Sequence, residues 1–299
     1  MEATLTDETQ RIRLLASRVE GLPALPIMAS KLLEVVDDPK ASAADMAALI
    51  STDPALATRL LKLANSAYYG FPRRIGTVNL AVVVLGLETV RDLCLSVLIT
   101  DCFFKGESNA TFDMNGFWKH SMYTAVCTRL IYKMAGARHP GEGFITGLVH
   151  DIGKLFLGRY FPVEYNEVIA TVEEEEFPLL EAEQQHFGVT HPTAGSWLLA
   201  EWNLPNWLVE AARDHHGSSS GGENVKLSCS VAFSDLLVRR KYQDEGGPGQ
   251  VNEITPEMIQ VLNMKKDVSG KPDFDIYNAK LEGEIDKAQG FMEAITKPG

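Results

Sequence analysis

The chain has 299 residues, 45% of them hydrophobic, and a formal net charge of −12. This length allows one large or two small domains with a substantial core. The acidic balance and the lack of a dense Lys/Arg cluster argue against direct binding of nucleic acid. The short basic groups Arg73-Arg74 and Arg239-Arg240-Lys241 are interpreted as solvated surface.

The first residues and the apolar runs indicate a cytoplasmic protein that does not contact a membrane. The chain opens with the acidic, polar stretch MEATLTDETQ, which lacks the features of a signal peptide. The longest apolar run, Leu80 to Leu87, is far shorter than the ~20 residues that span a bilayer. The four cysteines form no CxxC pair, so we expect buried thiols in a reducing compartment.

Apolar residues at helical spacing run through the first hundred residues. They predict helices over 12–19, 24–36, 43–51, 77–85 and 88–100, with one more starting after Asp53. Ser42 and Asp45 approach a capping box, and Asp53-Pro54 suits the start of a helix. Residues 81–84 are rich in valine and leave a strand as the alternative, although the lack of turn residues around them favours a helix.

The polar segment 105–110 (KGESNA) is the candidate boundary between two halves. A second helical region is expected over 117–240, with breaks at 138–141 and 217–222, and an amphipathic helix over 279–295. We therefore expect an all-α protein. Its parts are a tail (1–11), an N-terminal helical half (12–108), a helical core (109–240), and a loop with a C-terminal helix that packs on the core (241–299).

Five of the seven histidines form a pattern with two aspartates. Imidazole and carboxylate are ligands that divalent metal ions accept, and a carboxylate can bridge two ions. Asp235 lies in an otherwise largely apolar segment, where a buried charge needs a partner. Satisfied structural histidines remain the alternative, and this is our interpretation of His139 and His186. The candidate metal ligands are His120, His150, Asp151, His191, His215, His216 and Asp235.

Several segments resemble known families. GLVHDIGKLFLGRY (147–160) is similar to the HD motif of the metal-dependent phosphohydrolase superfamily, and the order H…HD…H…HH…D resembles its HD-GYP branch. The chain departs from HD-GYP enzymes at 217–222, where GSSSGG replaces the GYP signature. Four further segments are LPALPIMASKLLEVVDDP, ALISTDPALATRLLKLANSAYYG, VNLAVVVLGLETVRDL and HPTAGSWLLAEWNLPNWLVEAARDHH. Through these segments, the chain resembles HDOD domains over residues 12–240.

The resemblance implies an assignment of these residues. His120, His150, Asp151 and Asp235 would surround one divalent ion, and Asp151 would bridge to a second ion held by His191 and His215, with His216 adjacent. Iron, manganese, nickel and magnesium are all open, as is the choice between one ion and two. Asp151 and Lys154 would be the catalytic residues, with Lys154 facing a bound phosphate oxygen. Its alternative role is to complement a helix C-terminus.

Two functions follow from the resemblance and the residues. The preferred one is a bacterial signalling output or adaptor module that contacts other signalling proteins, because a phosphohydrolase has no need of the N-terminal half. Tyr68, Tyr69 and Phe71 could anchor such a partner or could pack a helix turn instead. The alternative is a metal-dependent phosphohydrolase that acts on a nucleotide or other phosphate ester, with Lys154 and Arg213 as the close phosphate-binding candidates.

Overall fold

The computed structural model describes residues 10–12, 14–16, 19, 24–104, 113–175, 177–216, 224–242, 253–268 and 270–296. Within these ranges, all regular secondary structure is helical, and extended backbone pairs at one isolated bridge, Lys266 to Pro272. The expected all-α fold is confirmed, and residues 81–84 are helical. The predicted boundary at 105–110, the break at 217–222 and the loop after Tyr242 lie outside the described residues.

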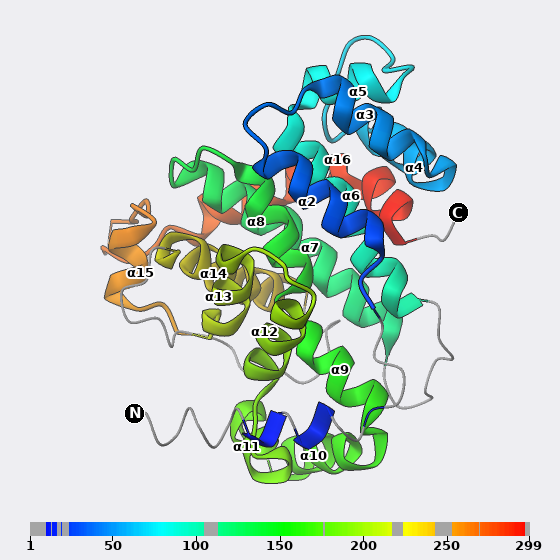
Figure 1. The fold of residues 1–299 in the computed structure, drawn as a ribbon. Coiled ribbons are helices and arrows are strands. Elements are labelled where there is room, and N and C mark those ends of the chain that lie inside the picture. The colour runs from blue at the N-terminus through cyan, green and yellow to red at the C-terminus, as the bar shows by residue number, and fades with distance from the viewer. Residues whose placement is uncertain are drawn as a thin grey trace.

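The helices between Ile27 and Leu85 gather at one end of the molecule, whereas the helical residues 10–12 and 14–16 lie at the other end (Figure 1). The predicted start signals are confirmed: Ser42 and Asp45 form a complete capping box, and Asp53 accepts a hydrogen bond from the backbone N–H of Leu56. These side chains satisfy N–H groups that have no partner within the helix. The helices are α2 (Ile27–Asp37), α3 (Ala43–Ser51), α4 (Pro54–Ala64), α5 (Val78–Leu85) and α6 (Leu87–Phe104).

The core is built around the long helix α7, which packs along α8 and α14, while α12 packs on α9 and α13. A Cβ on Gly147 of α8 would lie 2.7 Å from the Cα of Ala125 on α7, so glycine lets these two helices approach closely. The core helices are α7 (Met114–Met134), α8 (Pro140–Val149), α9 (Ile152–Tyr160), α12 (His191–Glu201), α13 (Asn206–Asp214) and α14 (Val225–Tyr242).

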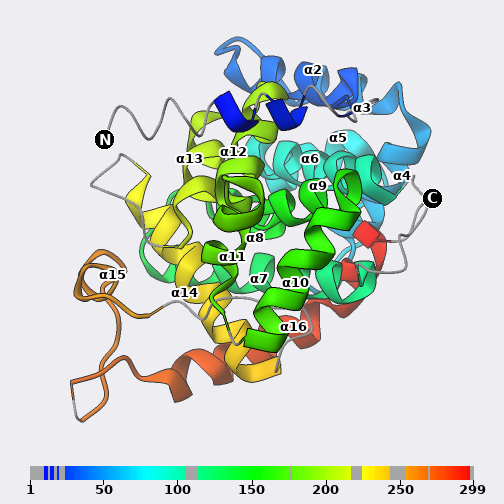
Figure 2. The ribbon, with the colours of Figure 1, turned by 90° about the horizontal axis from the view of Figure 1, so that it is seen from below.

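The helices α10 (Pro162–Glu175) and α11 (Leu179–Phe187) pack on each other at the far end of the core. They lie lowest in Figure 1 and nearest the viewer in Figure 2. The short helix α15 (Pro256–Val261) contacts α14. None of the helices in the described part of the chain is both long and apolar enough to cross a membrane.

The C-terminal helix α16 (Phe274–Thr296) joins the two halves. It packs on α7 of the core and also on α4 and α6. Phe291 is fully buried, and its ring centroid lies 4.9 Å from that of Tyr68 and 5.2 Å from that of Phe144. The predicted C-terminal helix is therefore present, and it covers the N-terminal half as well as the core.

Candidate metal centre

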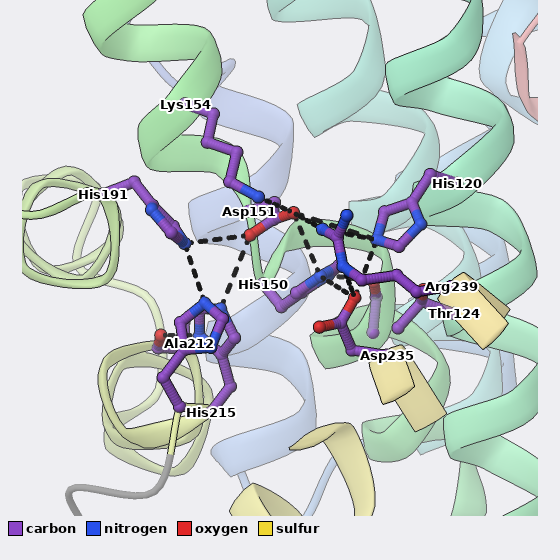
Figure 3. Close-up of polar contacts among 12 residues, drawn as sticks. His120, Thr124, His150, Asp151, Lys154, His191, Ala212, His215, Asp235 and Arg239 are labelled. Atoms are coloured by element: carbon purple, nitrogen blue, oxygen red, sulfur yellow. Dashed lines mark hydrogen bonds and ion pairs between the residues drawn. The ribbon is translucent and has the colours of Figure 1, made fainter. Parts of the chain in front are cut away.

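All seven predicted ligands converge in the middle of the core, where α7, α8, α9, α12, α13 and α14 meet (Figure 3). His120 lies on α7 and Asp235 on α14. His150 and Asp151 occupy the short junction between α8 and α9, and His191 begins α12. His215 and His216 directly follow α13. Segments more than a hundred residues apart in the sequence thus supply one site.

The junction between α8 and α9 fixes the His-Asp pair. His150 is the C-cap of α8 and Asp151 the N-cap of α9. Gly153 lies inside α9, where a Cβ would overlap the carbonyl oxygen of His191 and lie 2.7 Å from the backbone nitrogen of Gly195. Gly153 therefore does not mark a turn. Its role is close packing of α9 against α12, which brings His191 to Asp151.

The candidate ligands form two groups, and Asp151 faces both. The first cluster is His120, His150 and Asp235. His120 Nε2 lies 3.0 Å from Asp235 Oδ1, and His150 Nε2 lies 3.7 Å from the same oxygen. Asp151 Oδ2 lies 3.3 Å from His150 Nε2. Atoms that bind one ion at 2.0–2.2 Å lie about 3.0–3.5 Å from one another, so these spacings are close to those of a metal site.

The second cluster is Asp151, His191, His215 and His216. Asp151 Oδ1 lies 3.2 Å from His191 Nε2 and 3.4 Å from His215 Nε2. His191 Nε2 lies 3.1 Å from His216 Nε2. Each carboxylate oxygen of Asp151 therefore faces a different cluster, as a bridging ligand would. His216 is half-buried, and the other ligands are buried.

Hydrogen bonds behind the imidazoles aim their inner nitrogens at the site. Nδ1 of His150 lies 2.8 Å from the carbonyl oxygen of Gly147, and Nδ1 of His215 lies 2.6 Å from that of Ala212. A carbonyl only accepts, so both Nδ1 atoms carry a proton, and each ring turns its Nε2 toward the site. Glu183 holds His191 in the same way, with an oxygen 2.8 Å from Nδ1. Such outer partners are typical of metal-binding histidines.

The residues of the second cluster fit a divalent cation. Asp151 Oδ1 is buried and makes no hydrogen bond, although imidazole nitrogens of His191 and His215 lie close to it. Acceptor atoms that face one another without a proton between them are costly when buried. A cation between them removes this cost, and nitrogen with carboxylate oxygen is a suitable donor set.

The charge states of His120 and His215 agree with ligation. Burial and the neighbouring Arg239 lower the pKa of His120 to about 4. Burial likewise lowers the pKa of His215 to about 4, so both rings are neutral at pH 7, as metal ligands must be. His150 differs: burial opposes its protonation, but the charge of Asp151 outweighs burial and raises the pKa of His150 to about 9. This ring is therefore protonated at pH 7 without a metal ion and would have to lose a proton to bind one.

Lys154 and Arg239 place positive charge within the site. Lys154 is 2% exposed and donates to Asp151 Oδ2 over 2.7 Å. Arg239 Nε donates to Asp235 Oδ1 over 2.8 Å, and its Nη2 lies 3.3 Å from Asp151 Oδ2 and 3.4 Å from His120 Nε2. The guanidinium thus touches the atoms of the first cluster. Against burial, it also holds the pKa of Asp235 well below its usual range.

A sequence model of the HDOD domain matches residues 22–218. This chain belongs to the HDOD family. An uncharacterized protein of Treponema pallidum (strain Nichols) is 28% identical over 237 residues, which are 78% of this chain and 45% of that protein. This HDOD chain therefore spans less than half the length of its curated relative.

Solved structures share the fold. An HDOD domain protein of unknown function from Geobacter sulfurreducens is 25% identical, with a TM-score of 0.78 over 97% of this chain and 98% of that one. A Shewanella amazonensis SB2B protein, provisionally named a phosphohydrolase, is 24% identical with a TM-score of 0.69 over 95% and 97% of the two chains. The HDOD fold predicted from the sequence is thus confirmed.

The sequence interpretation missed two residues of the HDOD site. Arg239 was expected on a solvated surface, which is wrong, because α14 is buried continuously from Leu227 to Arg239. Its spacing of four residues from Asp235 is a signal for an ion pair on a helix. Glu183 also escaped notice, although it lies on the buried face of α11 with Leu179 and Phe187. A carboxylate on such a face is a sign of a buried polar partner.

The three aromatic residues considered for partner binding differ in exposure. Tyr68 is 8% exposed and packs on Phe291, Tyr69 is half-buried, and Phe71 is 37% exposed. The guanidinium of Arg129 lies 4.6 Å from the ring centroid of Tyr68. Tyr68 therefore packs inside the protein, which was the alternative to partner binding. A partner-binding role for Tyr69 and Phe71 stays a prediction.

Arg213, which was considered for phosphate binding, pairs with its neighbour Asp214.

Proposed function

We propose that this HDOD chain is a signalling output or adaptor module whose HD-type site holds divalent metal without turning over a phosphate ester. One observation carries this proposal: six of the seven candidate ligands are closed off from solvent. His120 is 3% exposed, and His150, Asp151, His191, His215 and Asp235 are each at most 1% exposed. A substrate phosphate has to reach the ion directly if the ion is to polarise it.

The second cluster would hold the ion, and a bound divalent ion would supply Lewis-acid character there. Asp151 orients toward it through Oδ1, while Glu183 and the carbonyl of Ala212 keep the rings of His191 and His215 in place. Lys154 donates to the other oxygen of Asp151, which supports a structural role in place of phosphate binding. An ion bound by Asp151, His191 and His215 would hold α9, α12 and α13 together, because these residues lie at the ends of those helices.

The outer face of α5 supports an adaptor role. Leu80, Val83 and Val84 are 41%, 63% and 41% exposed and lie three and four residues apart, so they share one face of the helix. This helix lies at the outer end of the N-terminal half (Figure 1). Grouped exposed apolar side chains are typical of surfaces that meet another protein.

Phosphate-ester hydrolysis is the second candidate, because both ligand clusters are present. For hydrolysis, the substrate would have to reach the ion past His216, which is half-buried. The Shewanella protein named above offers an analogy of fold alone.

A paired experiment tests the proposal. Protein loaded with Mn²⁺ is assayed for hydrolysis of bis-p-nitrophenyl phosphate and nucleoside triphosphates, with Asp151→Asn as the metal-deficient control. We expect wild type and Asp151→Asn to be equally inactive. In parallel, crosslinked partners are quantified for Val83→Asp and for Val163→Asp, a matched exposed valine on α10. Partner yield should fall at least fivefold in Val83→Asp only.

Two results would contradict this account. Hydrolysis by wild type that disappears in Asp151→Asn would make the chain a phosphohydrolase. Equal partner yields for Val83→Asp and Val163→Asp would remove α5 as the docking surface.

A further inference from the structure

We propose that Arg239 is a built-in cation that takes the place of a metal ion in the first cluster, so that the site holds one divalent ion, in the second cluster. This inference rests on the proposed metal binding and specifies the number and position of the ions. It also assigns to Arg239 the role of excluding a second ion.

The position of the guanidinium carries the argument (Figure 3). Its Nε donates to Asp235 Oδ1, the oxygen that also faces His120 and His150. Its Nη2 lies between Asp151 Oδ2 and His120 Nε2, at 3.3 and 3.4 Å. An ion shared by the first cluster and Asp151 would need these same atoms at about 2.0–2.2 Å. The guanidinium and the ion would compete for the same lone pairs.

The charge balance points the same way. Around the first cluster, the side chains of Asp151 and Asp235 bring two negative charges, and those of Lys154 and Arg239 bring two positive ones. Glu183 adds a further negative charge behind His191, on the side of the second cluster. A divalent ion in the first cluster would lie beside a guanidinium in a region of low dielectric, where like charges repel strongly. In the second cluster, the atoms around Asp151 Oδ1 are imidazole nitrogens, which attract a cation.

Burial makes the arrangement permanent in the folded state. The side chains of Arg239 and Asp235 are 1% and 0% exposed, so the guanidinium cannot leave the first cluster while α14 stays packed. Hydrolysis by two ions relies on both to clamp the attacking and leaving oxygens. A site with one ion and one guanidinium lacks that pair of ions. This agrees with a module that binds a metal ion and does not hydrolyse a phosphate ester.

The test counts Mn²⁺ ions per chain after equilibrium dialysis of metal-free protein, by inductively coupled plasma mass spectrometry. We expect one ion in wild type and two in Arg239→Met, in which a neutral side chain of similar length replaces the guanidinium. The second ion should bind at least tenfold more tightly in Arg239→Met than in wild type. It should disappear again when His120→Ala is added. Arg240→Met, at the exposed neighbouring position, should stay at one ion.

Each outcome has a distinct meaning. Two ions in wild type would overturn the inference and leave metal binding in place, and one ion in Arg239→Met would also overturn it. No ion in wild type would contradict the proposed metal binding itself. If Arg239→Met does not fold, Arg239→Gln replaces it. If that variant also fails, anomalous diffraction from Mn²⁺-soaked wild-type crystals decides, because a peak in the first cluster overturns the inference and a single peak in the second supports it.

Discussion

At the scale of single residues, buried charges in this protein are held in place by a second layer of partners. Glu183 is fully buried, and its carboxylate accepts from both the backbone N–H and Nδ1 of His191. This double contact fixes the first residue of α12 and the direction of its ring. The order of histidines and aspartates was enough to predict which side chains meet in one place. The outer partners escaped because a helical pattern shows that a face is buried but not what that face meets.

We expect Glu183→Gln to weaken Mn²⁺ binding by about 10-fold or more, since loss of an outer partner typically costs 10–100-fold in affinity. The glutamine loses the charge that fixes His191 and retains similar volume. Isothermal titration with Mn²⁺ measures the change, and Glu181→Gln, an exposed position on the same helix, is the control. Unchanged affinity in Glu183→Gln would show that His191 is not a ligand.

At the scale of elements, the site depends on how closely α9 approaches α12. Helix starts were readable from local chemistry, as at Ser42 and Asp53, because a capping side chain acts within a few residues. The contact between α9 and α12 could not be predicted from the sequence, because Gly153 and Gly195 are 42 positions apart and meet only in the folded chain. A glycine in a sequence is compatible with a turn and with a close approach of two helices, and the sequence alone does not distinguish the two.

Gly153→Ala should destabilise the protein by about 1–3 kcal/mol, the range for overpacking a well-packed contact, because the new methyl group would meet the backbone of His191. It should also weaken Mn²⁺ binding, since α12 carries that histidine. Urea unfolding of the metal-free protein gives the change in the free energy of unfolding. Gly283→Ala is the matched control: nothing lies within 4 Å of its Cβ position on α16, so it should gain up to about 1 kcal/mol from helix propensity. Equal effects at the two positions would refute the packing argument.

At the scale of the whole molecule, α16 and the HD-type core hold the N-terminal half in a fixed place. The amphipathic pattern predicted this last helix. Its contacts with α4, α6 and α7 came only from the structure, because a stripe of apolar residues does not show which helices it packs against. Phe291 shows this directly, since it bridges Tyr68 of the N-terminal half and Phe144 of the core. A metal ion in that core would therefore stabilise the unit to which the proposed partner surface on α5 is attached.

We propose that the core of this HDOD chain holds a metal ion in a largely closed site. Anomalous diffraction at the manganese edge, from crystals grown with Mn²⁺ and without chelator, tests it most directly. The account predicts one peak within about 2.0–2.4 Å of ligand atoms of Asp151, His191 and His215. A map with no peak among these residues, from crystals in which the fold is intact, would contradict it.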